Sequence, residues 1–193
     1  YGFSPYDRSE AYTSSDGGSV YFDGTSGNRL TDGSTNSASD EIQLGTGNFT
    51  IEFWYNPVSV TSTWEAIISK RYANTGGWRL YKDTGNGYLK WYRSSSNSLT
   101  TSSAVLHNHT WTHIAVVRNS GTMKIYANGI EAGSASDTYD YTTSSAGEIE
   151  IGSGLVTSEF PAEGHIADVR IVVGTAVYTG NFTPPTKILT KTG

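Results

Sequence analysis

The side chains best suited to chemistry fall on one predicted hairpin. Residues 77–83 (GWRLYKD) and 88–93 (YLKWYR) flank Thr84-Gly85-Asn86-Gly87, in which Asn-Gly is a strong signal for a hairpin turn. Side chains alternate between the two faces of a strand. One face of this hairpin therefore carries apolar residues that we expect in the core, namely Trp78, Leu80, Leu89 and Trp91. The other face carries Arg79, Tyr81, Lys90 and Tyr92.

The second face combines aromatic rings with cations, and both kinds of group hold sugars. Aromatic faces stack on the C–H surfaces of a sugar, while charged groups hydrogen-bond its oxygens. Trp64, Tyr139 and Tyr141 lie in or beside loops, where binding residues concentrate. The pattern predicts a glycan site at Arg79, Tyr81, Lys90, Tyr92 and Trp64. The alternative is that the hairpin residues form ordinary cross-strand pairs on a solvated sheet.

The spacing of the acidic residues and histidines does not indicate a catalytic site. Glu148 and Glu150 (EIEIG) share one strand face, and glycoside hydrolysis uses two carboxylates, but we expect a solvated face without catalytic role. His107 and His109 form a loop pair with no third metal ligand nearby in the sequence. No G-x-S-x-G motif frames a nucleophilic serine. We therefore predict that the protein is not an enzyme.

Three Asn-x-Thr sequons begin at Asn48, Asn108 and Asn181. Such sequons matter only in a eukaryotic secretory route. A sequence rich in Asn and Thr contains several by chance, and we interpret these three as accidental.

The composition of the 193 residues favours strands and turns. Ser and Thr supply 25 residues each and Gly 22, while only 16% of the residues are charged. With 36% hydrophobic residues the chain can build a sizeable core. No apolar run reaches the ~20 residues of a membrane span. A net charge of −5 without a Lys/Arg cluster gives no footprint for nucleic acid, and the absence of cysteine excludes disulfides.

The chain contains roughly ten to twelve short strand-like segments and no convincing helix. The clearest are residues 19–22, 49–55, 111–118, 122–127 and 164–173. Many short, closely spaced strands predict an antiparallel sandwich or barrel. We expect residues 1–16 to form an N-terminal arm or linker and residues 17–193 to form one domain with strands near both ends paired. Pro184-Pro185 predicts an extended tail.

Several motifs follow one another in a characteristic order. They are GSVYFDG from Gly18, GTGNFTIEFWYNP with Trp54, WTHIAVVRNSGTMKIYANG from Trp111, IGSG from Ile151 and GHIADVRIV from Gly164. From Gly18 onward this order resembles the laminin-G-like domains of the concanavalin A-like lectin/glucanase superfamily. The resemblance implies an all-β jelly roll, a sandwich of two curved antiparallel sheets.

The resemblance also implies candidate residues. Glucanases of the superfamily carry Glu-x-Asp-x-x-Glu on one strand, but here Ser153 stands in place of the third acid. Relatives often bind calcium between the first and last strands, and Asp23 and Asp168 lie in the matching neighbourhoods. Many relatives place the acid three residues before an Arg, where this chain has Ala167; the shift of one residue turns Asp168 to the other face. The family uses the position of His113 for packing and a hydrogen bond.

The closing segment from Asp168 (DVRIVVGTAVYTGNFTPPTKILT) resembles the end of laminin-G-like domains in bacteriophage virion proteins, especially those of marine phages. This resemblance implies a non-enzymatic binding or adhesion module on a virion appendage, such as a fibre, knob or capsid decoration. Its partners would be cell-surface glycan and other virion proteins, and its location the virion or the extracellular space. The alternative is a structural decoration or oligomerisation module without carbohydrate binding. Both alternatives are compatible with a homo-oligomer.

Overall fold

The computed structural model describes residues 18–32, 42–61, 64–72, 75–93, 96–142, 148–154 and 160–189. The expected arm over residues 1–16 lies outside this part of the chain. The strands of the described residues are β1 (Ser19–Asp23), β2 (Leu30–Thr31), β3 (Phe49–Pro57), β4 (Glu65–Tyr72), β5 (Thr75–Lys82), β6 (Leu89–Arg93), β7 (Ser96–Thr100), β8 (Thr112–Asn119), β9 (Thr122–Ala127), β10 (Ile130–Ser136), β11 (Ile149–Ile151) and β12 (Glu163–Val173). Among these residues, no helix is long and apolar enough to span a membrane.

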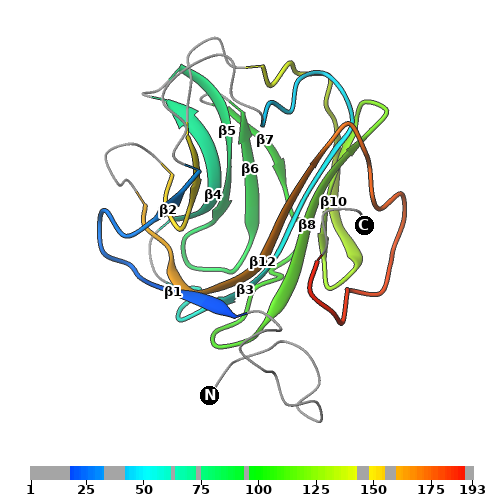
Figure 1. Cartoon of the computed structure of the whole chain (residues 1–193). Coiled ribbons are helices and arrows are strands. Elements are labelled where there is room, and N and C mark those ends of the chain that lie inside the picture. The colour runs from blue at the N-terminus through cyan, green and yellow to red at the C-terminus, as the bar shows by residue number, and fades with distance from the viewer. Residues whose placement is uncertain are drawn as a thin grey trace.

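The strands form two antiparallel sheets of six strands each (Figure 1). Sheet A has the order β1-β12-β3-β8-β9-β10, and sheet B has the order β2-β11-β4-β5-β6-β7. The chain repeatedly changes sheet, for example from β3 to β4 and from β7 to β8, as the strands of a jelly roll do. The predicted all-β sandwich of two antiparallel sheets is confirmed. The predicted pairing of strands near the two ends is also confirmed, because β1 pairs with β12.

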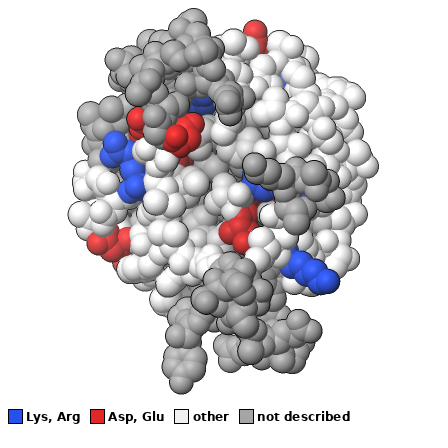
Figure 2. Space-filling view, in the orientation of Figure 1, with Lys and Arg blue, Asp and Glu red and all other residues white. Residues whose placement is uncertain are grey.

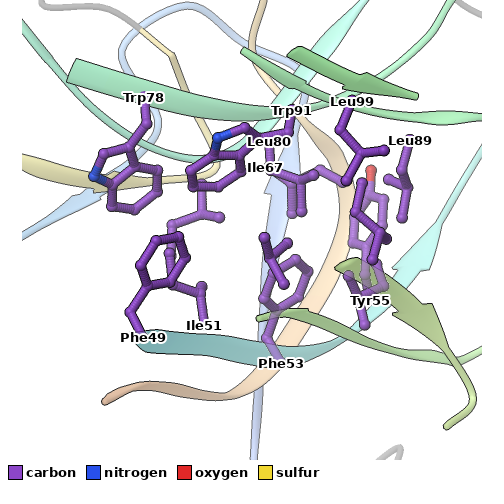
Figure 3. Packing of buried hydrophobic residues seen from close by; sticks show 14 of the residues in the cluster. Phe49, Ile51, Phe53, Tyr55, Ile67, Trp78, Leu80, Leu89, Trp91 and Leu99 are labelled. Atoms are coloured by element: carbon purple, nitrogen blue, oxygen red, sulfur yellow. The ribbon is translucent and has the colours of Figure 1, made fainter. Parts of the chain in front are cut away.

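The core lies between the two sheets and follows from the alternation of side chains (Figure 3). Sheet A contributes every second residue of β3: Phe49, Ile51, Phe53 and Tyr55. Sheet B contributes the predicted apolar face of the hairpin, which is confirmed: Trp78, Leu80, Leu89 and Trp91 are each at most 1% exposed. The rings of Trp78 and Trp91 stack with their centroids 5.1 Å apart. Burial of each such side chain stabilises the fold by about 1.5–3 kcal/mol.

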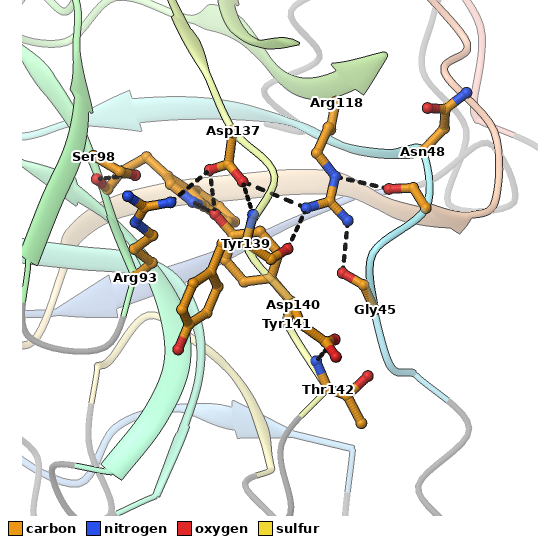
Figure 4. A network of polar contacts seen from close by, with 12 residues as sticks. Gly45, Asn48, Arg93, Ser98, Arg118, Asp137, Tyr139, Asp140, Tyr141 and Thr142 are labelled. Carbon is orange, nitrogen blue, oxygen red and sulfur yellow. Dashed lines mark hydrogen bonds and ion pairs between the residues drawn. The ribbon is translucent and has the colours of Figure 1, made fainter. Parts of the chain in front are cut away.

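One end of the core encloses the cation of Arg118, on β8 (Figure 4). Its Nε donates to the carbonyl oxygen of Gly47 at 2.7 Å, and its Nη2 donates to that of Gly45 at 2.6 Å. Its Nη1 donates to the carbonyl oxygen of Tyr139 at 2.6 Å and lies 3.4 Å from Oδ1 of Asp137. The side chain thus ties the loop before β3 to the segment after β10. A buried charge is tolerated only when it is paired and hydrogen-bonded, as this one is.

Residues 174–189, which we call the C-terminal segment, cover the outer face of sheet A (Figure 1). The rings of Tyr178 and Phe182 stack at 3.5 Å between centroids, and both pack on a small cluster of buried residues of β8 and β9. The backbone N–H of Phe182 donates to the carbonyl oxygen of Gly129 at 2.9 Å. The predicted tail is therefore docked on the sheet, and its apolar side chains replace solvent over that face.

Under the C-terminal segment lies a buried carboxylate, Glu52 of β3. It accepts hydrogen bonds from Nε of Arg170 and from the hydroxyl of Tyr178, both at 2.7 Å, and its Oε2 lies 3.2 Å from Nε2 of His113. Burial by itself would raise the pKa of Glu52, but the contacts with His113, Tyr178 and Arg170 together outweigh it and hold that pKa below its ordinary value of 4.5. His113 is fully buried, in agreement with the packing role that the family resemblance implies.

The lowered pKa of Glu52 predicts a specific acid sensitivity. Its ionised form stabilises the fold above about pH 4.5, and this contribution is lost as the pH falls through the lower pKa of the folded state. We expect Glu52→Gln to lower the free energy of unfolding by about 1.5–3 kcal/mol at pH 7, because charge-assisted hydrogen bonds are lost. The variant should then lose less stability than the parent protein between pH 5 and pH 3. Urea titrations across this range measure both slopes, and parallel slopes would contradict the assignment.

Candidate functional site

The predicted glycan residues gather on the outer face of sheet B, the face turned away from the core. In the pairing of β5 with β6, Arg79 lies opposite Tyr92 and Tyr81 lies opposite Lys90. Trp64 precedes β4, and its side chain reaches the same face, since its ring lies 5.6 Å from that of Tyr81. The fold therefore brings all five predicted residues together. We call Trp64, Arg79, Tyr81, Lys90 and Tyr92 the Trp64 surface.

Ring contacts organise the Trp64 surface. Trp64, Tyr81 and Tyr92 meet pairwise edge to face, with centroids between 5.4 and 5.9 Å apart. This geometry is the one that aromatic quadrupoles favour. Nζ of Lys90 lies 4.7 Å from the ring centroid of Trp64 and 2.8 Å from Oδ2 of Asp83. The three rings and the ammonium group therefore hold one another in place, so that the surface is preorganised.

The five side chains differ in exposure. Trp64, Lys90 and Tyr92 are half-buried and reach solvent. Arg79 and Tyr81 are only 8% and 2% exposed. The open face predicted from alternation is therefore limited to Trp64, Lys90 and Tyr92. Gly154 and Phe160 lie close to the two buried members: a Cβ on Gly154 would come within 3.6 Å of Cδ of Arg79, and the ring of Phe160 lies 5.8 Å from that of Tyr81.

The two predicted calcium ligands do not come together. Asp23 lies opposite Glu163 on β12, whereas Asp168 follows Ala167, which lies opposite Ser19. Four residues of strand separate these positions along β1, or about 13 Å at the usual rise of a strand. Calcium–oxygen distances are about 2.3–2.6 Å, so one ion cannot bind both carboxylates. Within the described residues no group of three His, Asp or Glu side chains is placed to hold a metal.

Each of these aspartates has a local setting of its own. Oδ1 of Asp23 accepts hydrogen bonds from the backbone N–H of Thr25 and the side chain of Asn28, and these bonds lower the pKa of Asp23 below its ordinary value. Asp168 has a φ of +51° within a β-bulge between Ala167 and Arg170. The bulge inserts one residue, so simple alternation cannot tell which way its side chain points.

The candidate catalytic carboxylates are not two solvated groups. Glu150 is 1% exposed, and its Oε1 lies 3.6 Å from Nε of Arg29, while Glu148 is half-buried. The expectation of a solvated strand face is therefore wrong at Glu150. The neighbouring position, Ser69 on β4, is also buried and packs beside β11.

The three sequon asparagines have structural partners. The side-chain oxygens of Asn48, Asn108 and Asn181 accept hydrogen bonds from the backbone N–H groups of Ser120, Val60 and Glu131 respectively, at 2.7–2.9 Å. Each bond joins segments that lie far apart in the sequence. The side chains therefore connect loops that are distant in the sequence.

Sequence reasoning missed three contributors to this region: Asp83, Gly154 and Phe160. Asp83 ends the predicted strand 77–83, so its pairing with Lys90 was open to inference from the hairpin register. No local pattern shows that Gly154 and Phe160 return to the outer face of sheet B. Phe160 is 40% exposed and adopts a φ of +60°, an unusual backbone conformation for an aromatic residue.

The strand order, the sandwich and the motif order define a lectin-like jelly roll. A model of the concanavalin A-like lectin/glucanases superfamily matches residues 30–175, most of the chain, and the protein belongs to this family. No curated protein sequence matches the chain.

Solved structures share the fold at low sequence identity. A heptameric SAP-like pentraxin from Limulus polyphemus has a TM-score of 0.58 and 18% identity, covering 83% of this chain and 77% of its own. Domain 4 of the arabinanase AbnA from Geobacillus stearothermophilus, in complex with arabinotriose, has a TM-score of 0.57 and 16% identity, with coverages of 85% and 86%. The CBM40 of the IT-sialidase from Ruminococcus gnavus, bound to α2,3-sialyllactose, has a TM-score of 0.59 and 13% identity, with coverages of 84% and 92%.

Proposed function

We propose that this domain is a non-enzymatic binding module that contacts cell-surface glycan through the Trp64 surface. The observation that carries the proposal is the preorganised group of half-exposed Trp64, Tyr92 and Lys90 on the outer face of sheet B. Sugars bind where aromatic faces stand beside a few fixed polar groups. The fold adds support, because two of the similar structures are described in complex with arabinotriose and with sialyllactose.

The absence of catalytic function is part of this proposal. The only paired carboxylates that the sequence offers on one strand are Glu148 and Glu150, and Glu150 is buried beside Arg29. Incubation with laminarin and with bacterial polysaccharides, followed by measurement of released reducing ends, tests this directly. Turnover of any of these polymers would contradict it.

The setting that we propose is a bacteriophage virion appendage, with other virion proteins as partners. The support is the resemblance of the closing segment to virion laminin-G-like domains and a surface of low charge density. On the face shown in Figure 2, Lys and Arg side chains are scattered among Asp, Glu and uncharged residues, with no continuous basic patch. Mass spectrometry of purified virions from the source of the gene tests this setting, and a chain absent from the particles would contradict it.

Substitution of the exposed rings tests the glycan site. We expect Tyr92→Ala and Trp64→Ala each to weaken glycan binding ~30-fold, because a central aromatic side chain typically contributes 2 kcal/mol or more. A glycan array followed by calorimetry on the best ligand measures the change. Tyr21→Ala is the matched control, since Tyr21 is 51% exposed on β1, in sheet A. Equal glycan affinity of the parent protein and all three variants would show that the Trp64 surface is not the binding site.

The alternative, a structural decoration or oligomerisation module, makes the opposite prediction. It requires a stable oligomer of the isolated domain in light scattering and no binding to any glycan on the array.

A further inference from the structure

Arg79 is a buried cation that has no acidic partner among the described residues. Its side chain belongs to the Trp64 surface, lies on β5 and is 8% exposed. Its guanidinium carbon lies 4.8 Å from the ring centroid of Tyr81. Nε is shielded from solvent and has no hydrogen-bond partner, and none of the ion pairs between described residues includes Arg79.

Two carboxylates of the described residues on the same side of sheet B, Asp83 and Glu150, pair with other cations. Asp83 lies 2.8 Å from Nζ of Lys90, and Glu150 lies 3.6 Å from Nε of Arg29. Arg118, the other guanidinium buried to this degree, shows the contrast, because three carbonyl oxygens and a carboxylate surround it. Buried charges in proteins are normally paired, so the lack of an acidic partner for Arg79 among the described residues needs an explanation.

A second polar group without a partner belongs to the same region. The hydroxyl of Ser153 is shielded from solvent and has no hydrogen-bond partner. Its backbone carbonyl oxygen accepts a hydrogen bond from Oγ of Ser69, and Ser69 lies directly opposite Arg79 in the sheet. The next residue is Gly154, where any Cβ would overlap that of Ala66. Ser153 and Gly154 therefore lie beside Ser69 and Ala66, the neighbours of Arg79 and Tyr81 on β4.

We propose that Arg79 binds the carboxylate of an acidic sugar, so that the glycan recognised by the Trp64 surface is a uronic-acid or sialic-acid polymer and not a neutral one. This inference rests on the proposed glycan-binding function and narrows its ligand class. A guanidinium presents parallel N–H donors that match the two oxygens of a carboxylate.

The geometry of the sheet supports one ligand spanning both groups. Arg79 and Tyr92 are directly opposite each other on β5 and β6, so their Cβ atoms lie about 5 Å apart. A pyranose ring stacked on Tyr92 therefore brings a carboxylate substituent within reach of Arg79. Because the chain carries a net charge of −5, general attraction of anions does not account for binding, and a local cation is required.

Matched pairs of sugars test the proposal on the full chain. The pairs are oligogalacturonate against its methyl ester, sialyllactose against lactose, and sulfated carrageenan against agarose. We expect one carboxylated sugar to bind about 10- to 100-fold more tightly than its neutral counterpart by calorimetry, the range for charge-assisted hydrogen bonds. Arg79→Met, which keeps the length of the side chain, should reduce the ratio of the two affinities to about one.

The outcomes separate this inference from the proposed function. Equal affinity for both members of every pair, or an unchanged preference in Arg79→Met, overturns the role of Arg79 and leaves glycan binding intact. A preference for the sulfated sugar alone also overturns the carboxylate assignment. Binding to no sugar overturns the proposed function together with the inference. Arg79→Lys keeps the charge without the paired donors; it should lose most of the preference and show by circular dichroism that the fold tolerates substitution at this position.

Discussion

Arg118→Met is expected to lower the free energy of unfolding by about 3–5 kcal/mol, because removing one partner of a buried ion pair is strongly destabilising and Asp137 keeps only the more distant Arg93, at 4.0 Å. The substitution leaves Asp137, 2% exposed, without its closest cation. It also leaves the carbonyl oxygens of Gly45, Gly47 and Tyr139 without the donors that Arg118 supplies. Methionine fills a similar volume, so the loss reports on the polar contacts more than on a cavity.

The rings around Arg118 extend the effect into the core. Its guanidinium carbon lies 5.0 Å from the ring centroids of both Phe49 and Tyr141. The hydroxyl of Tyr141 donates to Asp137 at 2.7 Å and accepts from Nε1 of Trp91 at 2.9 Å. A change at Arg118 therefore reaches the stacked tryptophans through Tyr141, and near-ultraviolet circular dichroism should change with stability.

Lys124→Met is the matched control for this experiment. Lys124 lies on the adjacent strand β9 and pairs with Glu131, but both side chains are partly exposed. An exposed ion pair is screened by solvent, and we expect no measurable change in the urea midpoint. If Arg118→Met unfolded at the same urea concentration as Lys124→Met, the network around Arg118 would not be a source of stability.

The sequence predicts the hairpin of β5 and β6 well because its information is local. The loop of residues 84–87 connects the two strands, and alternation then assigns Trp78 and Trp91 to the core and Arg79 and Tyr92 to the opposite face. The same two rules, turn residues and alternation, predict a sandwich of many short antiparallel strands but not the order of those strands in each sheet.

What the sequence does not show is which segments return to cover a face. Alternation alone predicts that Arg79 and Tyr81 face solvent, but both are buried. The tail after β12 likewise has a composition typical of an exposed segment, yet Tyr178 and Phe182 pack on sheet A. Contacts of this kind join residues that are far apart in the chain, and no local propensity encodes them.

The β-bulge in β12 is a second feature that the alternation of residue types does not predict. The calcium expectation depended on whether Asp168 points to the same face as an acid one residue earlier. The chain inserts an extra residue between Ala167 and Arg170, so that side chains do not alternate regularly between the two faces at Asp168. The register with β1, which keeps Asp23 away from Asp168, becomes visible only when the two ends of the chain are paired.

The Gly129→Ala variant, which adds one methyl group, tests whether the C-terminal segment is docked on sheet A. Gly129 occupies the β9–β10 turn with a φ of +77°, and a Cβ there would overlap the carbonyl oxygen of Phe182. We expect Gly129→Ala to lower the free energy of unfolding by about 2–5 kcal/mol, as the sum of left-handed backbone strain and overpacking. The C-terminal segment must then move, so limited proteolysis should cleave it sooner in the variant than in the parent protein.

Gly121→Ala separates the two contributions. Gly121 lies in the β8–β9 turn with a φ of +80°, and like Gly129 it follows a residue of positive φ. A Cβ at Gly121 would meet only a methyl group of Thr138 at 3.7 Å, an ordinary contact. The cost of this control is therefore the backbone strain alone, about 1–2 kcal/mol. Because the turns are matched, the difference between the two variants in urea unfolding measures what the close approach of the C-terminal segment contributes, and equal losses would mean that this segment does not hold sheet A.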